Sequence, residues 1–418
     1  MVGACNTGVN ESRRTNRMRP MKITKLETLR AGEFPNLVWV RLHTDEGPVG
    51  LGETNFSAQS VETYLHEYIA PRLLGRNPLE IEAIARSLQG YLGTRSSGVE
   101  TRAISAVDIA LWDLFGKVCG MPLYQVLGGA SRPAIRTYNT CAGYRYIRDA
   151  RLQSSANWGL DAKQEGPYED LDAFLHRADE LAQSLLGEGI TAMKIWPFDT
   201  CAEASDGWHI SGPDLDTALE PFRKIRRAVG NRMDIMVEFH SLWRLPPAQR
   251  IARALAEFDT YWHEDPIRMD SLDLLKAYAP HSKAPICASE ILAGRWSFKD
   301  LLQTGVAGIV MFDLAWCGGI SEARRIAALA DAWQLPVAPH DCVGPIVYAA
   351  SCHFSTWAPN ALVQESVRAF YSGWYNELVT HVPRPVKGMI AAPPGPGIGS
   401  ELLPDLTKRA DVSVRVSS

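Results

Sequence analysis

The feature that most constrains the fold is a series of short apolar segments that recurs along most of the chain. These segments alternate with amphipathic helical stretches from Ile135 onward, the pattern of βα units that build a parallel sheet. They lie near residues 135–140, 191–196, 233–239, 259–264, 284–290, 307–313, 335–340 and 361–365. Eight strands favour a closed barrel over an open sheet, so the sequence predicts an α/β fold of the TIM-barrel type.

Six of these predicted strands end in a titratable side chain. They are Glu238, Glu264, Glu290, Asp313, His340 and Glu365, at successive intervals of 26, 26, 23, 27 and 25 residues. Each interval is the length of one βα unit. In a barrel, side chains at the carboxyl ends of the strands converge on one mouth, where the active sites of barrel enzymes lie. We therefore expect these six residues in one active site.

Three of the six are glutamates on consecutive predicted strands. Glu238, Glu264 and Glu290 would repel one another and resist ionisation unless a divalent cation neutralised them. An all-oxygen ligand set favours Mg²⁺ over Zn²⁺. Any one of these glutamates could instead cap a helix or pair with an arginine, but three in register predict a magnesium site.

Two histidines at the predicted mouth are candidates for proton transfer. His340 and Asp313 end neighbouring strands, and a carboxylate beside an imidazole holds one tautomer and raises its basicity, which suits a general base. His240 lies two residues beyond Glu238 and shares its face, which makes it a candidate general acid. A structural core histidine is the alternative for His340, and a hydrogen bond or stacking on Trp243 is the alternative for His240.

The second predicted strand carries a cation and an aromatic ring toward the mouth. Lys194 and Trp196 share the inward parity, so Lys194 could stabilise an anionic intermediate and Trp196 could form a wall against the substrate. The apolar neighbours of Lys194 argue against a surface lysine. His263 has the opposite parity to Glu264, so we expect it to face the outer helices.

The chain before the barrel has a different pattern. Residues 21–55 alternate apolar and polar positions, which predicts three antiparallel strands, and residues 60–127 have a helical period. We expect a disordered leader over 1–20 and an α+β capping domain over 21–130, followed by the barrel over 131–381 and a tail over 382–418 that packs on the capping domain. Polar stretches over 144–169 and 199–213 predict long loops.

Charge and composition exclude several classes of protein. The net charge of −4, without a dense Lys/Arg run beyond the first 20 residues, predicts no nucleic-acid or membrane partner and a small-molecule substrate. Eight cysteines without a CxxC pair and the lack of a secretory signal or a long apolar run favour a cytoplasmic location. The Gly50-Leu-Gly52 segment lacks the third glycine of a dinucleotide fingerprint.

From Met21 onward these features resemble the enolase superfamily, in its mandelate racemase/muconate lactonizing enzyme-like branch. The segments that carry the resemblance are SAVDIALWDL from Ser105, Val237-Glu238, Glu264-Asp-Pro, Ser289-Glu290, Asp313 followed by Cys317-Gly-Gly, Pro339-His340-Asp and Glu365. The resemblance implies a (β/α)7β modified barrel with an N-terminal α+β capping domain and three carboxylate ligands for Mg²⁺. It also implies a symmetric homo-oligomer, with an octamer as one expected form.

One departure from the branch bears on the reaction. The branch often has Lys-x-Lys on the second strand, but here Trp196 stands in place of the second lysine, which disfavours a racemase with two bases. The Glu238-Phe-His240 segment resembles galactonate and mannonate dehydratases, in which the histidine acts as general acid. Glu365 matches the acid on the eighth strand that contacts the substrate carboxylate or the enolate oxygen.

The sequence therefore predicts a magnesium-dependent sugar acid dehydratase that forms a 2-keto-3-deoxy acid. An epimerase, racemase or cycloisomerase that uses the same enolate is the alternative, and a non-catalytic sugar-acid binding barrel is a third reading. Substrate contacts are expected at Trp196, Asp341 and Thr54. Specificity is expected from loops near 54–60, 94–97 and 144–169, which leaves the particular acid open.

Overall fold

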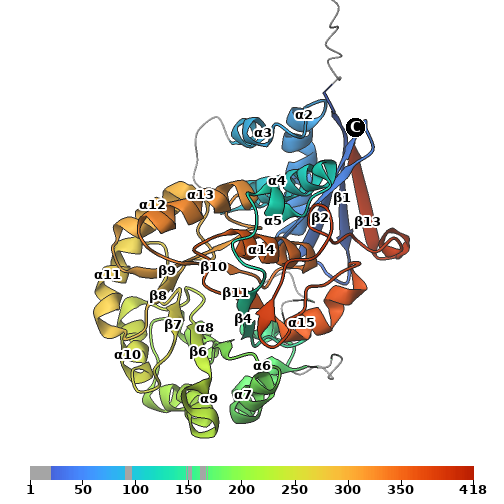
Figure 1. Ribbon diagram of the computed structural model, residues 1–418. Helices are drawn as coiled ribbons and strands as arrows, with labels where there is room; N and C mark the ends of the chain where they lie inside the picture. The colour runs from blue at the N-terminus through green and yellow to red at the C-terminus, as the bar shows by residue number, and fades with distance from the viewer. Residues whose placement is uncertain (1–19, 90–96, 147, 149–152, 161–165, 167) are drawn as a thin grey trace, which may run out of the picture.

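The computed structural model describes residues 20–89, 97–146, 148, 153–160, 166 and 168–418. An antiparallel sheet with helices forms one part of the molecule, and a ring of parallel strands surrounded by helices forms the other (Figure 1). The predicted leader, apart from Pro20, and most of the 94–97 loop lie outside the described residues.

The N-terminal part is a sheet covered by helices. Its first three strands are β1 (Ile23–Ala31), β2 (Leu37–Thr44) and β3 (Val49–Asn55), and its helices are α1 (Ala58–Tyr64), α2 (Ala70–Leu73), α3 (Ile81–Leu88), α4 (Val99–Cys119) and α5 (Leu123–Val126). Helix α4 lies against β3, where a Cβ atom at Gly50 or Gly52 would collide with carbonyl oxygens of the helix. These two glycines therefore serve the packing of helix on sheet.

The C-terminal tail adds a fourth strand to this sheet. Strand β13 (Val412–Ser417) pairs antiparallel with β1, and the sheet order is β13-β1-β2-β3. In Figure 1 the red β13 runs beside the blue β1. The three strands expected over 21–55 are present, and the tail contacts this part of the molecule as expected, but its strand was not predicted. The missed signal is the alternation of Val412, Val414 and Val416 with polar residues, which is typical of a strand with one apolar face.

The second part is a closed barrel of eight parallel strands, and the predicted fold class is confirmed. The strands are β4 (Ile135–Thr140), β5 (Ala192–Ile195), β6 (Asp234–Glu238), β7 (Trp262–Glu264), β8 (Ile286–Ala288), β9 (Ala307–Asp313), β10 (Val337–His340) and β11 (Gln364–Ser366). They are paired in chain order, and β11 pairs with β4. A bridge from Val337 to Ala361, just before β11, closes the ring. Strand β12 (Met389–Ile390) of the tail pairs with β4.

Helices surround the barrel. They are α6 (Asp170–His176), α7 (Ala178–Gly187), α8 (Asp199–Ser205), α9 (Gly212–Val229), α10 (Leu245–Leu255), α11 (Leu275–Tyr278), α12 (Gly294–Gln303), α13 (Gly319–Ala332), α14 (Pro345–Trp357) and α15 (Arg368–Ser372). The prediction of a loop over 199–213 was wrong, because α8 and the start of α9 lie there. Among the described helices, none has the length and apolar character needed to cross a membrane.

Buried carboxylates of the N-terminal part bind backbone groups of the barrel. Glu53 accepts hydrogen bonds from the N–H groups of Ile346 and Val347 at 3.1 and 3.0 Å, in the first turn of α14. Asp108 accepts one from the N–H of Ser321, at 2.8 Å, in the first turn of α13. The positive ends of two barrel helices are therefore capped by side chains from the other part of the molecule.

Glu53 gives the fold a dependence on pH. Burial outweighs its hydrogen bonds and raises the pKa of Glu53 from 4.5 to about 7. The folded chain therefore holds one more proton than the unfolded chain between these pH values, so stability is lost as pH rises through that window, by up to about 3 kcal/mol. We expect Glu53→Gln to flatten the decline in the free energy of urea unfolding between pH 4.5 and 7. An unchanged slope would contradict this role.

Candidate active site

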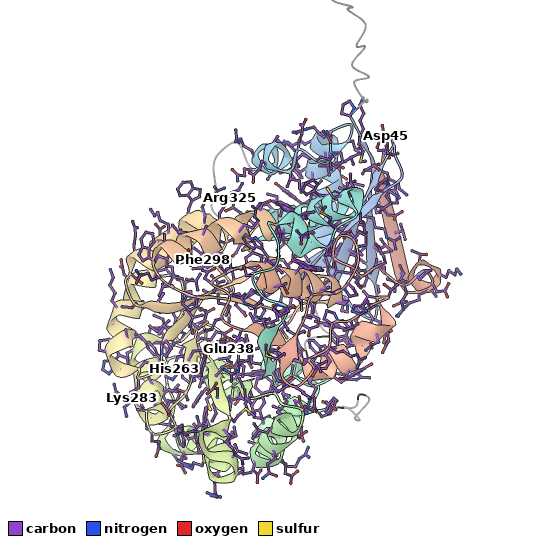
Figure 2. All side chains as sticks on the ribbon, in the orientation of Figure 1. Asp45, Glu238, His263, Lys283, Phe298 and Arg325 are labelled. Carbon is purple, nitrogen blue, oxygen red and sulfur yellow. The ribbon has the colours of Figure 1, made fainter. Side chains whose placement is uncertain are left out.

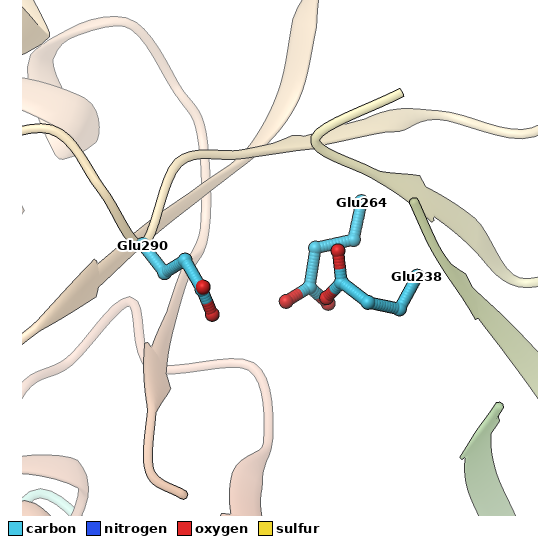
Figure 3. A group of neighbouring side chains, drawn as sticks. All are labelled: Glu238, Glu264 and Glu290. Atoms are coloured by element: carbon cyan, nitrogen blue, oxygen red, sulfur yellow. The ribbon is translucent and has the colours of Figure 1, made fainter. Parts of the chain in front are cut away.

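Three glutamates meet at the carboxyl end of the barrel strands. Glu238 ends β6, Glu264 ends β7 beside it in register, and Glu290 follows β8 by two residues. Candidate ligand oxygens from the three side chains all lie within 4.8 Å of one another. Figure 2 shows Glu238 in the interior of the barrel, and in Figure 3 the carboxylate of Glu290 faces those of Glu238 and Glu264.

The electrostatics of this cluster suit a divalent cation. Burial raises the pKa of Glu238 to about 7, and burial together with the charge of Glu238 raises the pKa of Glu264 well above its ordinary value. Burial and the neighbouring negative charge both make ionisation of these carboxylates unfavourable. A cation bound between the carboxylates would offset that cost. Among the described residues, this is the one group of three acidic, histidine or cysteine side chains close enough to hold a metal ion.

Lys194 of β5 brings a fixed positive charge to the cluster. Its Nζ lies 2.8 Å from Glu264, 3.0 Å from Glu365 of β11 and 3.4 Å from Glu238. Burial alone would lower the pKa of this amine, but the carboxylates outweigh burial and hold the pKa well above its ordinary value. The cluster therefore favours the charged form of Lys194, whose Nζ lies next to oxygens of two candidate metal ligands.

His340 is held between two carboxylates. Its Nδ1 lies 2.7 Å from Asp313 Oδ2, so the sequence-predicted pair is in hydrogen-bond contact. Its Nε2 lies 2.7 Å from Glu290 Oε2, a contact that strand spacing did not predict. The ring of Trp316 lies against the imidazole, with the two centroids 5.2 Å apart. Asp313 binds Nδ1, and Nε2 is the nitrogen of His340 that faces the candidate metal ligand Glu290.

A second histidine–aspartate pair lies at the same mouth. His240 Nδ1 is 2.6 Å from Oδ2 of Asp199, the first residue of α8, and both side chains are largely buried. The backbone of His240 has a left-handed φ of 48°, and its N–H donates to Glu238 Oε1 at 2.6 Å. The sequence did not single out Asp199, because it lies in a stretch predicted to be a loop.

The two histidines line one cavity. The lining residues are Phe56, Thr140, Tyr146, Gln153, Lys194, Trp196, His240, Glu290, Trp316, His340, Cys342 and Glu365. Trp196, which was expected to form a wall against the substrate, is among these lining residues. Its ring centroid lies 5.8 Å from that of His240.

Two predicted substrate contacts are placed elsewhere. Neither Thr54 nor Asp341 is among the residues that line the cavity. The hydroxyl of Thr54 donates to the carbonyl of Ala315 at 3.0 Å, and the backbone N–H of Asp341 donates to Glu365 Oε2 at 2.7 Å. Asp341 therefore holds Glu365, which lines the cavity, whereas Thr54 binds a backbone carbonyl of a residue that does not line it.

His263 faces away from the mouth, as its parity predicted. Its ring nitrogens lie 2.7 Å from the hydroxyl of Tyr278, on α11, and 3.0 Å from that of Thr260. Burial lowers the pKa of His263 to about 3. A neutral histidine among hydroxyl groups on the outer side of the barrel has a structural role.

A closed barrel of this kind, with three buried glutamates, a lysine and a histidine–aspartate pair at its mouth, defines an enzyme of the enolase superfamily. The chain belongs to the mandelate racemase/muconate lactonizing enzyme family. Residues 7–128 match the N-terminal domain model of that family, and residues 177–406 match the enolase C-terminal domain-like model.

Several known proteins are similar over almost the whole chain. D-Galactonate dehydratase of Xanthomonas oryzae is 31% identical, with 94% of each chain covered. D-Xylonate dehydratase of Haloferax volcanii is 30% identical and covers 92% of this chain and 88% of its own. The crystal structure of an enolase of the mandelate racemase subgroup from Agrobacterium tumefaciens has a TM-score of 0.84 at 58% identity, covering 95% of this chain and 98% of its own.

Proposed function

We propose that this protein is a magnesium-dependent sugar acid dehydratase. The observation that carries the proposal is the presence of two histidines on one cavity, each with Nδ1 bound to a buried aspartate. Such a pair leaves Nε2 of each ring for the substrate, so one histidine can take a proton and the other can give one. Relatives named as dehydratases of galactonate and xylonate support a sugar acid as substrate.

The proton α to a carboxylate is too weakly acidic for a histidine to remove unless the charge that develops is stabilised. Held by Glu238, Glu264 and Glu290, Mg²⁺ would supply Lewis-acid stabilisation of the substrate carboxylate. Lys194 adds its fixed positive charge beside the same carboxylate. Glu365, held by Lys194 and by the N–H of Asp341, would hydrogen-bond to the reacting end of the substrate.

Two proton transfers complete the reaction. His340 takes the C2 proton at Nε2, and Asp313 stabilises the imidazolium that forms. The electron pair of the C2–H bond passes into the substrate carboxylate to give an enolate. It then forms the C2–C3 double bond as His240 donates a proton from Nε2 to the C3 hydroxyl, which leaves as water. The O–H proton of the enol moves to C3 through solvent to give the 2-keto-3-deoxy acid, while His340 releases its proton to solvent and His240 takes one up.

The second histidine–aspartate pair also favours one alternative. With a base on each side of the α-carbon, His240 could return a proton to C2 and the enzyme would be an epimerase. The test of both readings is incubation of aldonic, aldaric and uronic acids with Mg²⁺ in D₂O, followed by mass spectrometry. Keto-acid formation supports the dehydratase, and deuterium uptake at C2 without loss of water supports the epimerase.

His240→Asn separates the two proton transfers. We expect this variant to form keto acid about 10² to 10⁴ times more slowly than the unaltered enzyme, because the hydroxyl must leave without a general acid. Exchange of the C2 proton with D₂O should continue, because His340 and Asp313 are intact. Asp199→Asn keeps the shape of the side chain but weakens its hydrogen bond to His240. Keto-acid formation should therefore slow by a smaller factor in this variant, and exchange of the C2 proton should continue. Equal loss of exchange and of dehydration would contradict the role of His240 as the acid.

A further inference from the structure

A second cavity lies beside the active-site cavity. It is lined by residues Phe34, Asn36, Leu37, Asn55, Tyr146, Arg148, Cys342, Val343, Phe370 and Trp374. We call it the outer cavity. It lies between the strand ends of the N-terminal sheet and the segments that follow β4, β10 and β11.

The two cavities share walls. Tyr146 and Cys342 line both. The ring of Tyr146 lies against Trp196, with centroids 5.3 Å apart, and Asn55 of the outer cavity accepts a hydrogen bond from the indole of Trp316 at 2.6 Å. A substrate that binds with its reacting end between Lys194 and His340 and extends past Tyr146 would therefore enter the outer cavity.

Arg148 is the one charged side chain among the described residues that line the outer cavity. Its side chain is 6% exposed, and its guanidinium carbon lies 4.9 Å from the ring centroids of both Phe34 and Tyr144. Glu33 pairs with this guanidinium and also with Arg409, at 2.6 Å. The other lining residues are aromatic or aliphatic side chains, a thiol and two amides.

We propose that the outer cavity binds a second carboxylate of the substrate, which makes the preferred substrate an aldaric acid, a sugar acid with a carboxylate at each end. The proposal rests on the proposed function for the reacting end. A guanidinium forms two parallel, charge-assisted hydrogen bonds with a carboxylate, and a shielded apolar surrounding strengthens them. The hydroxymethyl end of an aldonic acid cannot form these charge-assisted hydrogen bonds with Arg148.

Substrate pairs of the same length and configuration test the proposal. We would measure kcat/KM with Mg²⁺ for galactarate against galactonate, and for glucarate against gluconate. We expect a preference for the diacid on the order of 100-fold, the size of effect that a desolvated charge pair supports. Preference for the aldonic acids would overturn the proposal. So would preference for 6-phosphogluconate, because the outer cavity would then take a phosphate.

Variants place the preference on one residue. Arg148→Met should bring the ratio of diacid to monoacid kcat/KM close to one, and Arg148→Lys should retain part of the preference. Arg409→Met is the matched control, because Arg409 binds the same Glu33 and contacts the same Phe34 ring, at 5.8 Å, but does not line the cavity. We expect Arg409→Met to leave the ratio unchanged. If both arginine variants lost the preference for the diacid equally, the preference would depend on Glu33 and the local fold, and the proposal would be overturned.

Binding measured without turnover separates this proposal from the proposed function. With Mg²⁺ present, galactarate should raise the thermal midpoint of the enzyme more than galactonate does, and Arg148→Met should abolish the difference. If that pattern is found but no acid is dehydrated, the outer cavity binds as proposed and the dehydratase reading fails. If aldonic acids are dehydrated but the diacid shows no advantage in binding, the function stands and the proposal for Arg148 fails.

Discussion

Replacing His340 with asparagine is expected to abolish both the formation of keto acid and the exchange of the C2 proton. His340 is the side chain whose Nε2 faces the candidate metal ligands while Nδ1 is held by Asp313 at 2.7 Å. Loss of a general base costs about 10² to 10⁴ in rate, and we expect a loss within that range. The measurement is α-deuterium content and keto acid by mass spectrometry in D₂O.

His176→Asn is the matched control for this variant. His176 lies at the end of α6 with its side chain 67% exposed, so its loss should leave both rates unchanged. Circular dichroism and the thermal midpoint should show that the His340 variant is folded, because asparagine can still hydrogen-bond with Asp313. Exchange at the unaltered rate in His340→Asn would assign the base to another group, and Lys194 would be the first to examine.

Replacing Glu264 with glutamine is expected to weaken the binding of Mg²⁺ and to lower kcat/KM by on the order of 10³, equivalent to about 4 kcal/mol. Glu264 is fully buried between Lys194 and the indole of Trp262, at 2.8 and 3.0 Å. The amide keeps the shape of the side chain but removes the negative charge that a divalent cation requires. Substitution should therefore act through the metal more than through the fold.

Thermal unfolding provides a measurement of Mg²⁺ binding that does not depend on turnover. The unaltered protein should gain stability as Mg²⁺ is added and lose it again with a chelator, whereas Glu264→Gln should respond only at concentrations at least about 100-fold higher. Glu67→Gln is the control, because Glu67 is 56% exposed on the surface and pairs with Arg415. A full Mg²⁺ response in Glu264→Gln would remove Glu264 from the ligand set.

The part of the site carried by strand ends could be predicted from the sequence. In a parallel barrel, residues at the carboxyl ends of successive strands converge, so the spacing of Glu238, Glu264 and Glu290 predicted a cluster without any knowledge of distances. Parity along a strand likewise assigned Lys194 to the inside and His263 to the outside. These inferences depend only on the geometry of single strands and βα units, which a repeating sequence pattern is enough to indicate.

The parts that could not be predicted depend on contacts between distant segments or on turns past the strand ends. Asp199 reaches His240 because a helix begins directly after β5, in a stretch whose polar composition predicted a loop. The cavity excludes Asp341 because the chain turns after His340. The contact of Glu290 with His340 depends on how the chain continues after β8. None of these directions follows from the spacing of residues alone.

The pairing of β13 with β1 has a consequence for how the protein is made. Val412 is translated 381 residues after Ala31, the residue it faces across the two strands. During synthesis the outer edge of β1 therefore has no partner while the whole barrel emerges from the ribosome. An open strand edge is a site for pairing with the wrong chain, so crowded nascent chains would be at greatest risk of aggregation during that interval. A fusion attached directly to Ser417 or Ser418 would hinder the pairing of β13 with β1, which covers this strand edge.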